Sequence, residues 1–331
     1  MNPFVRSLDP VLKNPKHCFV GEAALEVLAQ DLAKKKFKTP AWRESCFPES
    51  DDQVIEFFGV ANAINFGFTD FKTGKQFDVE YPKGSGKIWK GSFAMVASLK
   101  RALDENFPIL HPYTLSQFSP NFAERIFRHH TTPIPMLNER VKNLQNIGRT
   151  FGFKKIWSFT DLFKDSDFYL FNNGKGILEK LTNFFDCYKD ISLWNGHTLQ
   201  FHKRAQLFAM AYHGRALSSN GKLQPIRDPE NFGPISDYRI PQVLRYFGLL
   251  CYRKELARKI EKGVLIPKDS DMEIEIRAQA VNIMHKLLLR INALRKGSPI
   301  TMTELDYFIW STGKKKSGSF GRHHFTYTTS Y

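Results

Sequence analysis

The sequence predicts a mainly α-helical protein that carries one small antiparallel β meander. Two observations lead to this fold class. Apolar residues recur at helical spacing in most segments of the chain, and only residues 65–90 break into short apolar runs divided by turns. The 331 residues show no internal repeat, and their length allows one large domain or two. We predict a single large helical domain over residues 1–331.

The predicted helices share an apolar stripe, a cap residue or a proline at their start. The cap candidates are Ser92, Ser119 and Thr301. In chain order the predicted helices cover residues 20–36, 51–64, 93–105, 119–128, 135–151, 177–188, 201–218, 241–252, 272–295 and 303–310. The tail from residue 314 to residue 331 is rich in Ser, Thr, Gly and His, and we expect it to be ordered in part at most.

Residues 83–87, Lys-Gly-Ser-Gly-Lys, lie inside the meander and partly match a phosphate-binding loop. The match fails because Tyr81 stands where the first glycine belongs and Ile88 replaces Ser or Thr. This segment is therefore predicted to be a hairpin turn.

The formal net charge is +15, which favours an anionic partner such as a nucleotide, a nucleic acid or an acidic surface. Part of the excess lies in the runs 34–36 and 314–316 (Lys314-Lys315-Lys316), which are typical of solvated faces. The N-terminus has no apolar signal-peptide core, and no run of about 18 apolar residues occurs. Four scattered cysteines fit a reducing compartment. These features predict a cytoplasmic protein with no membrane contact.

The ten histidines and four cysteines show no metal-ligand spacing, so we expect no metal site. The nucleophile motif of α/β-hydrolases and the glycine motif of dinucleotide folds are also missing.

Asp237 is the first candidate for chemistry. It precedes Pro241, which suits the first turn of a helix, and a run of apolar residues at helical spacing follows. Asp237 should therefore lie beside free backbone N–H groups at the positive end of a helix dipole, where a carboxylate stays ionised and fixed. The alternative is that Asp237 only caps the loop or pairs with Arg239.

Two further clusters suit a nucleotide. Asn65 can donate and accept hydrogen bonds at a base edge, and Phe66 and Phe68 can stack on a base. Lys203 and Arg204 open a helix, where paired cations make a phosphate seat. The alternatives are that both phenylalanines belong to the core and that the two cations form a solvated turn.

Five stretches together resemble the queuosine salvage family, the queuosine 5′-phosphate N-glycosidases. They keep the family's order and spacing from residue 65 to residue 310: Asn65-Phe66-Gly67-Phe68, Lys203-Arg204-Ala205-Gln206, Asp237-Tyr238-Arg239-Ile240-Pro241-Gln242-Val243-Leu244, Glu275-Ile276-Arg277 and Leu305-Asp306-Tyr307-Phe308-Ile309-Trp310. The resemblance thins before residue 50 and in the tail. Two positions depart from the family pattern: Thr69 stands where the family usually has Trp, and Phe93 alone remains of an aromatic pair.

The resemblance implies hydrolysis of the N-glycosidic bond of queuosine 5′-monophosphate, which releases queuine and ribose 5-phosphate for queuine salvage in tRNA modification. It also implies a helical fold distantly like helix-hairpin-helix DNA glycosylases, no cofactor, and no stable nucleic-acid complex. Asp237 is the implied catalytic residue. The implied substrate-binding residues are Asn65, Phe66, Phe68, Phe93, Lys203, Arg204, Gln206, Tyr238, Arg239, Glu275, Asp306 and Trp310.

The chemistry of the residues agrees with this picture. Breaking the C–N bond builds positive charge on the sugar. Asp237 can stabilise that charge, attack the sugar carbon directly, or activate a water molecule that attacks it. The sequence leaves these three routes open. The leaving base, queuine, is a 7-deazapurine and so lacks the nitrogen at position 7 that normally accepts a proton. The site must therefore hydrogen-bond the pyrimidine edge of the base. Asn65, Glu275 and Asp306 are the candidates for that edge.

Two other functions compete with this hypothesis. The net charge and the fold analogy also fit a nucleic-acid-binding protein or a base-excision glycosylase, which would need a continuous basic face. A catalytically silent interaction module is disfavoured, since Asn65, Lys203, Arg204 and Asp237 would then be polar groups without a shared task.

Overall fold

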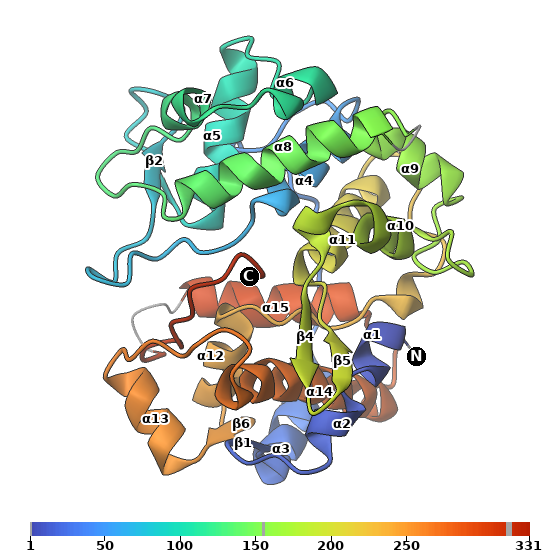
Figure 1. Ribbon diagram of the computed structural model, residues 1–331. Coiled ribbons are helices and arrows are strands. Elements are labelled where there is room, and N and C mark those ends of the chain that lie inside the picture. Colours follow the sequence, from blue (N-terminus) through green and yellow to red (C-terminus); the bar gives the residue numbers. More distant parts are fainter. Residues whose placement is uncertain (1, 154–155, 316–319) are drawn as a thin grey trace.

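Residues 2–153, 156–315 and 320–331 are described by a computed structural model, in which they form fifteen α-helices, two 3-10 helices and six short strands. The predicted mainly α class is confirmed. Figure 1 shows two halves, with helices α4 to α11 in one and helices α1 to α3 and α12 to α15 in the other. Within the described ranges, no helix is both long and apolar enough to cross a membrane. Lys316 of the predicted solvated run lies outside these ranges.

The first half contains α4 (Val54–Ala63), α5 (Ser92–Asp104), α6 (Pro112–Ser116), α7 (Pro120–Ile126), α8 (Leu137–Phe153), α9 (Phe159–Asp165), α10 (Ile177–Phe184), η1 (Asp186–Tyr188) and α11 (Lys203–Leu217). In α4 every residue except Glu56 is buried. The Glu56 carboxylate accepts the N–H groups of Phe159 and Thr160 at 3.0 and 2.8 Å and so caps α9.

The second half contains α1 (Pro3–Arg6), α2 (Asp9–Leu12), α3 (Glu22–Ala33), η2 (Pro229–Asn231), α12 (Arg239–Tyr246), α13 (Lys254–Glu261), α14 (Asp271–Leu294) and α15 (Met302–Lys315). Two predicted caps are confirmed: the Ser119 and Thr301 hydroxyls each accept a backbone N–H three residues on, at 3.3 Å. The predicted Ser92 cap is wrong, because Ser92 is already the first residue of α5 and Gly91, with a φ of +60°, takes the cap position. Five helices were not predicted from the sequence: α1, α2, α6, α9 and α13. The longest has eight residues, which is too short to show a clear helical period.

The strands form three antiparallel pairs. Strands β2 (Asp78–Glu80) and β3 (Ile88–Lys90) confirm the predicted meander, with an isolated bridge between Thr69 and Gln76. The other pairs are β1 (Cys18–Val20) with β6 (Leu250–Tyr252) and β4 (Ile191–Trp194) with β5 (His197–Gln200). The prediction that the meander is the only β structure is therefore wrong. Asn195-Gly196, both at positive φ, was the local signal for the β4–β5 hairpin.

The predicted helix over residues 241–252 is correct only in its first part. Helix α12 ends at Tyr246, and Gly248 adopts a φ of +73°. This left-handed glycine turns the chain, so that Leu250 and Cys251 enter strand β6 instead of a further helical turn.

The tail is more ordered than expected. Residues 320–331 fold back between the two halves, and the C-terminal end lies near the centre of the view in Figure 1. The Tyr331 carbonyl accepts the Gly67 N–H at 3.1 Å, and the Phe325 carbonyl accepts the Ile266 N–H at 2.8 Å. The expectation of a tail ordered in part at most is wrong for these residues, because their aromatic rings find partners far away in the sequence: Phe325 stacks on Phe71.

Candidate functional site

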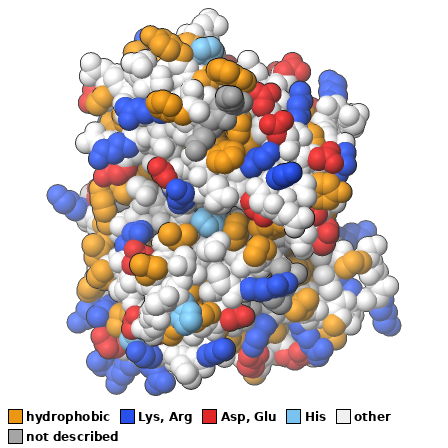
Figure 2. Space-filling view, turned by 45° about the vertical axis from the view of Figure 1, so that its right-hand side comes forward, with side chains coloured by type: hydrophobic (Ala, Val, Ile, Leu, Met, Phe, Trp, Pro, Cys, Tyr) orange, Lys and Arg blue, Asp and Glu red, His pale blue; other side chains and the backbone are white. Residues whose placement is uncertain are grey.

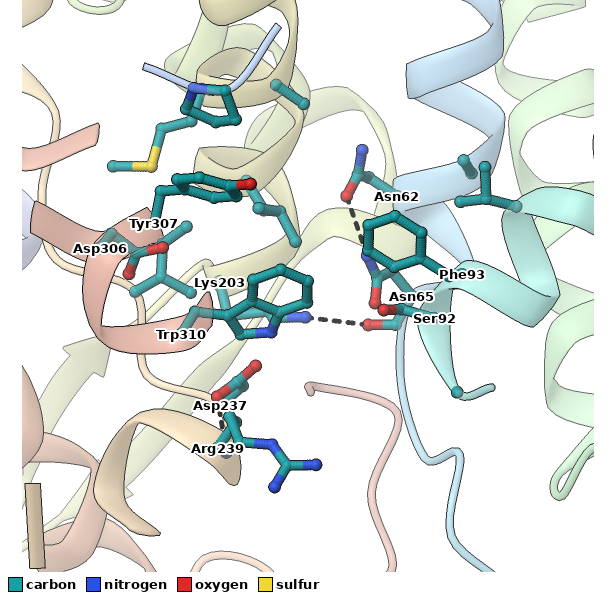
Figure 3. A pocket seen from close by; sticks show the side chains of 18 of the residues that line it. Asn62, Asn65, Ser92, Phe93, Lys203, Asp237, Arg239, Asp306, Tyr307 and Trp310 are labelled. Atoms are coloured by element: carbon teal, nitrogen blue, oxygen red, sulfur yellow. Dashed lines mark hydrogen bonds between the residues drawn. The ribbon is translucent and has the colours of Figure 1, made fainter. Parts of the chain in front are cut away.

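One pocket draws its walls from both halves of the molecule. The first half contributes α4 with the loop after it, the start of α5, and α11, while the second contributes residues 235–240 and α15. Figure 3 shows their side chains pointing toward one another. Of the residues predicted from the sequence, those that line the pocket are Asn65, Phe68, Phe93, Lys203, Asp237, Tyr238, Arg239, Asp306 and Trp310.

Asp237 lies at the head of α12, as its place before Pro241 predicts. Its Oδ1 accepts the N–H groups of Arg239 and Ile240 at 2.7 and 2.9 Å. These two bonds fix the carboxylate and favour its charge. No described residue hydrogen-bonds the second oxygen, Oδ2. Arg239 does not pair with this carboxylate, because its Nη1 donates to Gln242 at 2.8 Å and its guanidinium points away from Asp237 in Figure 3.

Helix α15 turns one face toward the pocket. Thr303, Asp306, Tyr307 and Trp310 follow the spacing i, i+3, i+4 and i+7, so they share that face. Within the part of the chain that the structure describes, Thr303 Oγ1 and Asp306 Oδ1 are buried without any hydrogen-bond partner. Such groups are rare in folded proteins and costly. At the pocket wall, these two atoms are available to a ligand with matching polar groups.

Lys203 reaches the pocket from the first turn of α11. Its side chain is almost fully buried, and Nζ donates to the Asn65 carbonyl at 3.1 Å. Burial lowers the pKa of the Lys203 ammonium to about 8, although the charge of Asp237 acts in the opposite direction. Asn65 is held by its neighbour one turn back, since its Nδ2 donates to Asn62 Oδ1 at 3.3 Å (Figure 3).

Aromatic rings form another wall. Phe93 lies between Trp89 and Trp310, with ring centroids 5.7 and 5.8 Å away and planes within 16° of parallel. The ammonium of Lys314 lies 3.3 Å from the Phe93 centroid, so this cation faces the pocket rather than solvent alone.

Trp42 lines the pocket and was not predicted from the sequence. Its backbone φ is +51°, unusual for a bulky side chain, and Arg215 Nη1 holds its carbonyl at 2.7 Å. The indole Nε1–H is buried without an acceptor among the described residues. Other pocket residues that were not predicted are Asn62, Ser92, Tyr307, Lys314 and Tyr331. Asn62 and Tyr307 carry a local signal, because helical spacing places them beside Asn65 and Trp310.

Four predicted substrate contacts do not line the pocket. Phe66 is in the core, between the guanidinium groups of Arg140 and Arg204 at 4.3 and 5.3 Å. Arg204 donates to the Ala63 carbonyl and is buried, so it is neither a solvated cation nor a pocket residue. These contacts stabilise the loop that carries Asn65, and the expectation of direct contact is corrected for both residues.

Gln206 and Glu275, the other two predicted substrate contacts outside the pocket, are also occupied by structural hydrogen bonds. Gln206 donates to the Phe201 carbonyl at 2.9 Å, and its Oε1 accepts from Asn2 and Gly233 at 3.2 Å. The Glu275 carboxylate accepts three successive backbone N–H groups, of residues 16 to 18, at 2.6 to 3.0 Å. Both side chains use their hydrogen bonds to join the N-terminal segment to the helices.

The Asp306 carboxyl should make the stability of the empty protein depend on pH. Burial, reinforced by the charge of Asp237, raises the pKa of Asp306 to about 8. Between about pH 4 and about pH 8 the folded protein therefore keeps a proton that the unfolded chain releases. This contribution to the free energy of unfolding falls as pH rises, by at most about 1.4 kcal/mol per pH unit. We expect Asp306→Asn to lose that dependence in urea unfolding.

Asp78 provides the matched control, because its pKa is shifted in the opposite direction. Burial raises the pKa of the Asp78 carboxyl, but hydrogen bonds from Thr131 and Thr132 outweigh burial, so the pKa is lowered. Its contribution is present above the unfolded pKa and is lost as pH falls through the folded pKa. Asp78→Asn should therefore be less stable than the wild type at neutral pH, and this difference should shrink in acid. A constant stability difference between Asp306→Asn and the wild type from about pH 4 to 8 would show that Asp306 is ionised in the folded protein.

The described residues contain no group of three His, Cys, Asp or Glu that could hold a metal ion. The fold and the pocket thus define a mainly helical protein whose aromatic-walled pocket holds two carboxylates and a buried lysine. The family model described as "Queuosine salvage protein" matches residues 46–331. The chain belongs to this queuosine salvage family.

Proteins from distant organisms are similar over nearly the full length. The queuosine 5′-phosphate N-glycosylase/hydrolase of Sphaerobacter thermophilus is 25% identical over 322 residues, which are 97% of this chain and 95% of the relative. The Dictyostelium discoideum protein of the same name is 30% identical over 337 residues, covering 96% and 94%. The Bos taurus protein of that name is 26% identical, covering 91% and 89%.

Proposed function

We propose that this protein is a hydrolase that cleaves the N-glycosidic bond of queuosine 5′-monophosphate and releases queuine and ribose 5-phosphate. The observation that carries the proposal is the Asp237 carboxylate, which two backbone N–H groups fix at the wall of a pocket lined by aromatic and polar side chains. The names of the relatives supply the bond and the substrate. The direct test is incubation with queuosine 5′-monophosphate and mass detection of the free base, and absence of queuine would refute the proposal.

In this mechanism Asp237 Oδ2 faces C1′ of the ribose. As the C–N bond breaks, positive charge develops on the sugar, and a fixed carboxylate stabilises it more than water can. The same oxygen can attack C1′ or orient a water molecule, and both routes end in the same products. The two N–H bonds to Oδ1 keep the carboxylate in place through either route.

The base lies between the aromatic wall and the polar groups opposite it. Phe93 and Trp310 contact the base from the same side, and Asp306 and Asn65 meet its pyrimidine edge. Asp306 suits this role because its Oδ1 lacks a protein partner. Lys203 contacts the phosphate in place of the predicted Lys203–Arg204 pair, since Arg204 is turned toward Ala63.

A nucleic-acid substrate fits the surface less well. On the face shown in Figure 2, lysine and arginine side chains are interspersed with aspartate and glutamate and do not form one continuous stripe. Binding to a phosphate backbone needs such a stripe. We therefore expect free nucleotide to be the substrate and no stable nucleic-acid complex. We also expect the protein to act in the cytoplasm, where its four free cysteines stay reduced.

Base release should be unaffected by EDTA. The proposed chemistry uses a carboxylate and hydrogen bonds, and the histidine and cysteine spacing predicts no metal ligands. The measurement is turnover of queuosine 5′-monophosphate before and after dialysis against EDTA. Loss of turnover that a divalent ion restores would contradict the metal-free mechanism.

A further inference from the structure

Arg277 lies in the second turn of α14 and is a buried cation near the pocket, although it does not line it. Only 1% of its side chain is exposed. Its Nη1 and Nη2 donate to Asp190 Oδ1 and Oδ2 at 3.0 and 2.6 Å, a two-pronged ion pair. Glu273, one turn earlier on the same helix, lies 3.7 Å away. Arg277 also belongs to a family-like motif that the proposed function leaves without a role.

Asp190 connects this ion pair to the pocket. Its Oδ2 also accepts the backbone N–H of Lys203 at 3.2 Å, so it caps the first turn of α11. Its carbonyl accepts the N–H groups of Phe201 and His202 at 2.9 and 3.1 Å, which closes the base of the β4–β5 hairpin. The start of α11, and with it the Lys203 side chain, is therefore fixed by a carboxylate that Arg277 holds.

Arg277 reaches the pocket by a second route. Its guanidinium packs between the rings of Phe201 and Tyr331, 3.9 and 4.6 Å from their centroids. Phe201 comes just before α11, and Tyr331 lines the pocket. One side chain thus contacts both the segment that leads to Lys203 and the tail residue that completes the wall.

We propose that Arg277 is a positioning residue that acts through Asp190 to place the Lys203 ammonium for phosphate binding. The inference rests on the proposed function, because it takes the phosphate to be what Lys203 binds. Lysine cannot replace this arginine, since one ammonium cannot hold both Asp190 oxygens while lying flat between two rings. A shift of about 1 Å in a binding group can cost on the order of 100-fold in rate.

The test compares kcat/KM for queuosine 5′-monophosphate and for the nucleoside queuosine, under excess enzyme so that slow reactions are measurable. Their ratio does not depend on how much of the enzyme is folded. Arg277→Lys should lower the ratio by roughly 10- to 100-fold. Arg101→Lys is the control, because Arg101 also donates two hydrogen bonds, to the carbonyls of Ile126 and Arg128 at 2.9 Å, but lies in the last turn of α5 and does not line the pocket. It should leave the ratio unchanged.

The outcomes separate this inference from the proposed function. If Arg277→Lys does not fold, Asp190→Asn, which keeps the shape of the side chain, should lower the ratio in the same way. An unchanged ratio in the Arg277 or Asp190 variant, beside a lowered ratio in Lys203→Met, would overturn the positioning role alone. If Lys203→Met also keeps the wild-type ratio, no phosphate contact exists for Arg277 to position, and the inference is wrong. A wild-type protein that cleaves neither substrate would remove the proposed function and the inference together.

Discussion

Asp237→Asn should release queuine from queuosine 5′-monophosphate about 100- to 1000-fold more slowly than the wild type, the usual effect of removing one preorganised electrostatic group. Asparagine has nearly the same shape, and its Oδ1 can still accept the N–H groups of Arg239 and Ile240. The head of α12 should therefore keep its structure, while the charge on the second atom is lost. The measurement is single-turnover base release, beside the affinity for queuine and the unfolding midpoint.

Asp78→Asn is the control for this prediction as well. Asp78 also accepts two backbone N–H groups, of Thr131 and Thr132 at 2.8 and 2.7 Å, but it does not line the pocket. Its replacement should change stability without a comparable loss of turnover. An Asp237→Asn protein that keeps more than about a tenth of the wild-type rate would exclude Asp237 as the catalytic carboxylate, given the loss expected for such a group.

Lys203→Met should remove most of the preference for the monophosphate over the nucleoside. A charge-assisted hydrogen bond to a phosphate contributes about 1.5–3 kcal/mol. At about 1.4 kcal/mol for each factor of ten, this contact corresponds to roughly 10- to 150-fold in kcat/KM. Methionine fills the space of the lysine stem but carries no charge. The measurement is kcat/KM for both substrates, which should become more nearly equal in the variant.

Arg204→Lys is the control next in the sequence. Arg204 is a buried cation that faces the Ala63 carbonyl and not the pocket, so its replacement should leave the preference intact. Intact tRNA should not release queuine, because its 3′ phosphodiester has no place in a pocket enclosed by both halves of the protein. Equal loss of activity on both substrates in Lys203→Met would remove the phosphate role, and base release from tRNA would favour the nucleic-acid hypothesis.

Local patterns in the sequence were sufficient for the residues whose geometry depends on one helix. The place of Asp237 before Pro241 predicts the two N–H bonds that the structure shows, and the period of α15 puts Asp306 and Trp310 on one face. Similarly, the turns within residues 65–90 predict the β2–β3 pair. In each case the interacting residues are close in the sequence, so the propensities of these residues and their spacing determine the local structure.

The residues that were misplaced depend on distant parts of the chain. Glu275 has the same neighbours in α14 whether it contacts a ligand or caps residues 16 to 18, and only the tertiary fold decides between the two. Arg204 and Lys203 are adjacent at the start of a helix, yet a helix points successive side chains about 100° apart. Trp42 and Tyr331 reach the pocket from segments without helical period, so no pattern could identify them.

The buried groups without partners around the pocket have an energetic consequence. Trp42 Nε1, Thr303 Oγ1 and Asp306 Oδ1 lack hydrogen bonds among the described residues, and each such group costs about 1–3 kcal/mol. That cost falls on the empty protein and is relieved when a ligand supplies the missing partners. Apolar residues of similar shape at these positions would give a more stable protein with a poorer site. Recognition and stability therefore compete at this pocket, a trade-off common to binding sites.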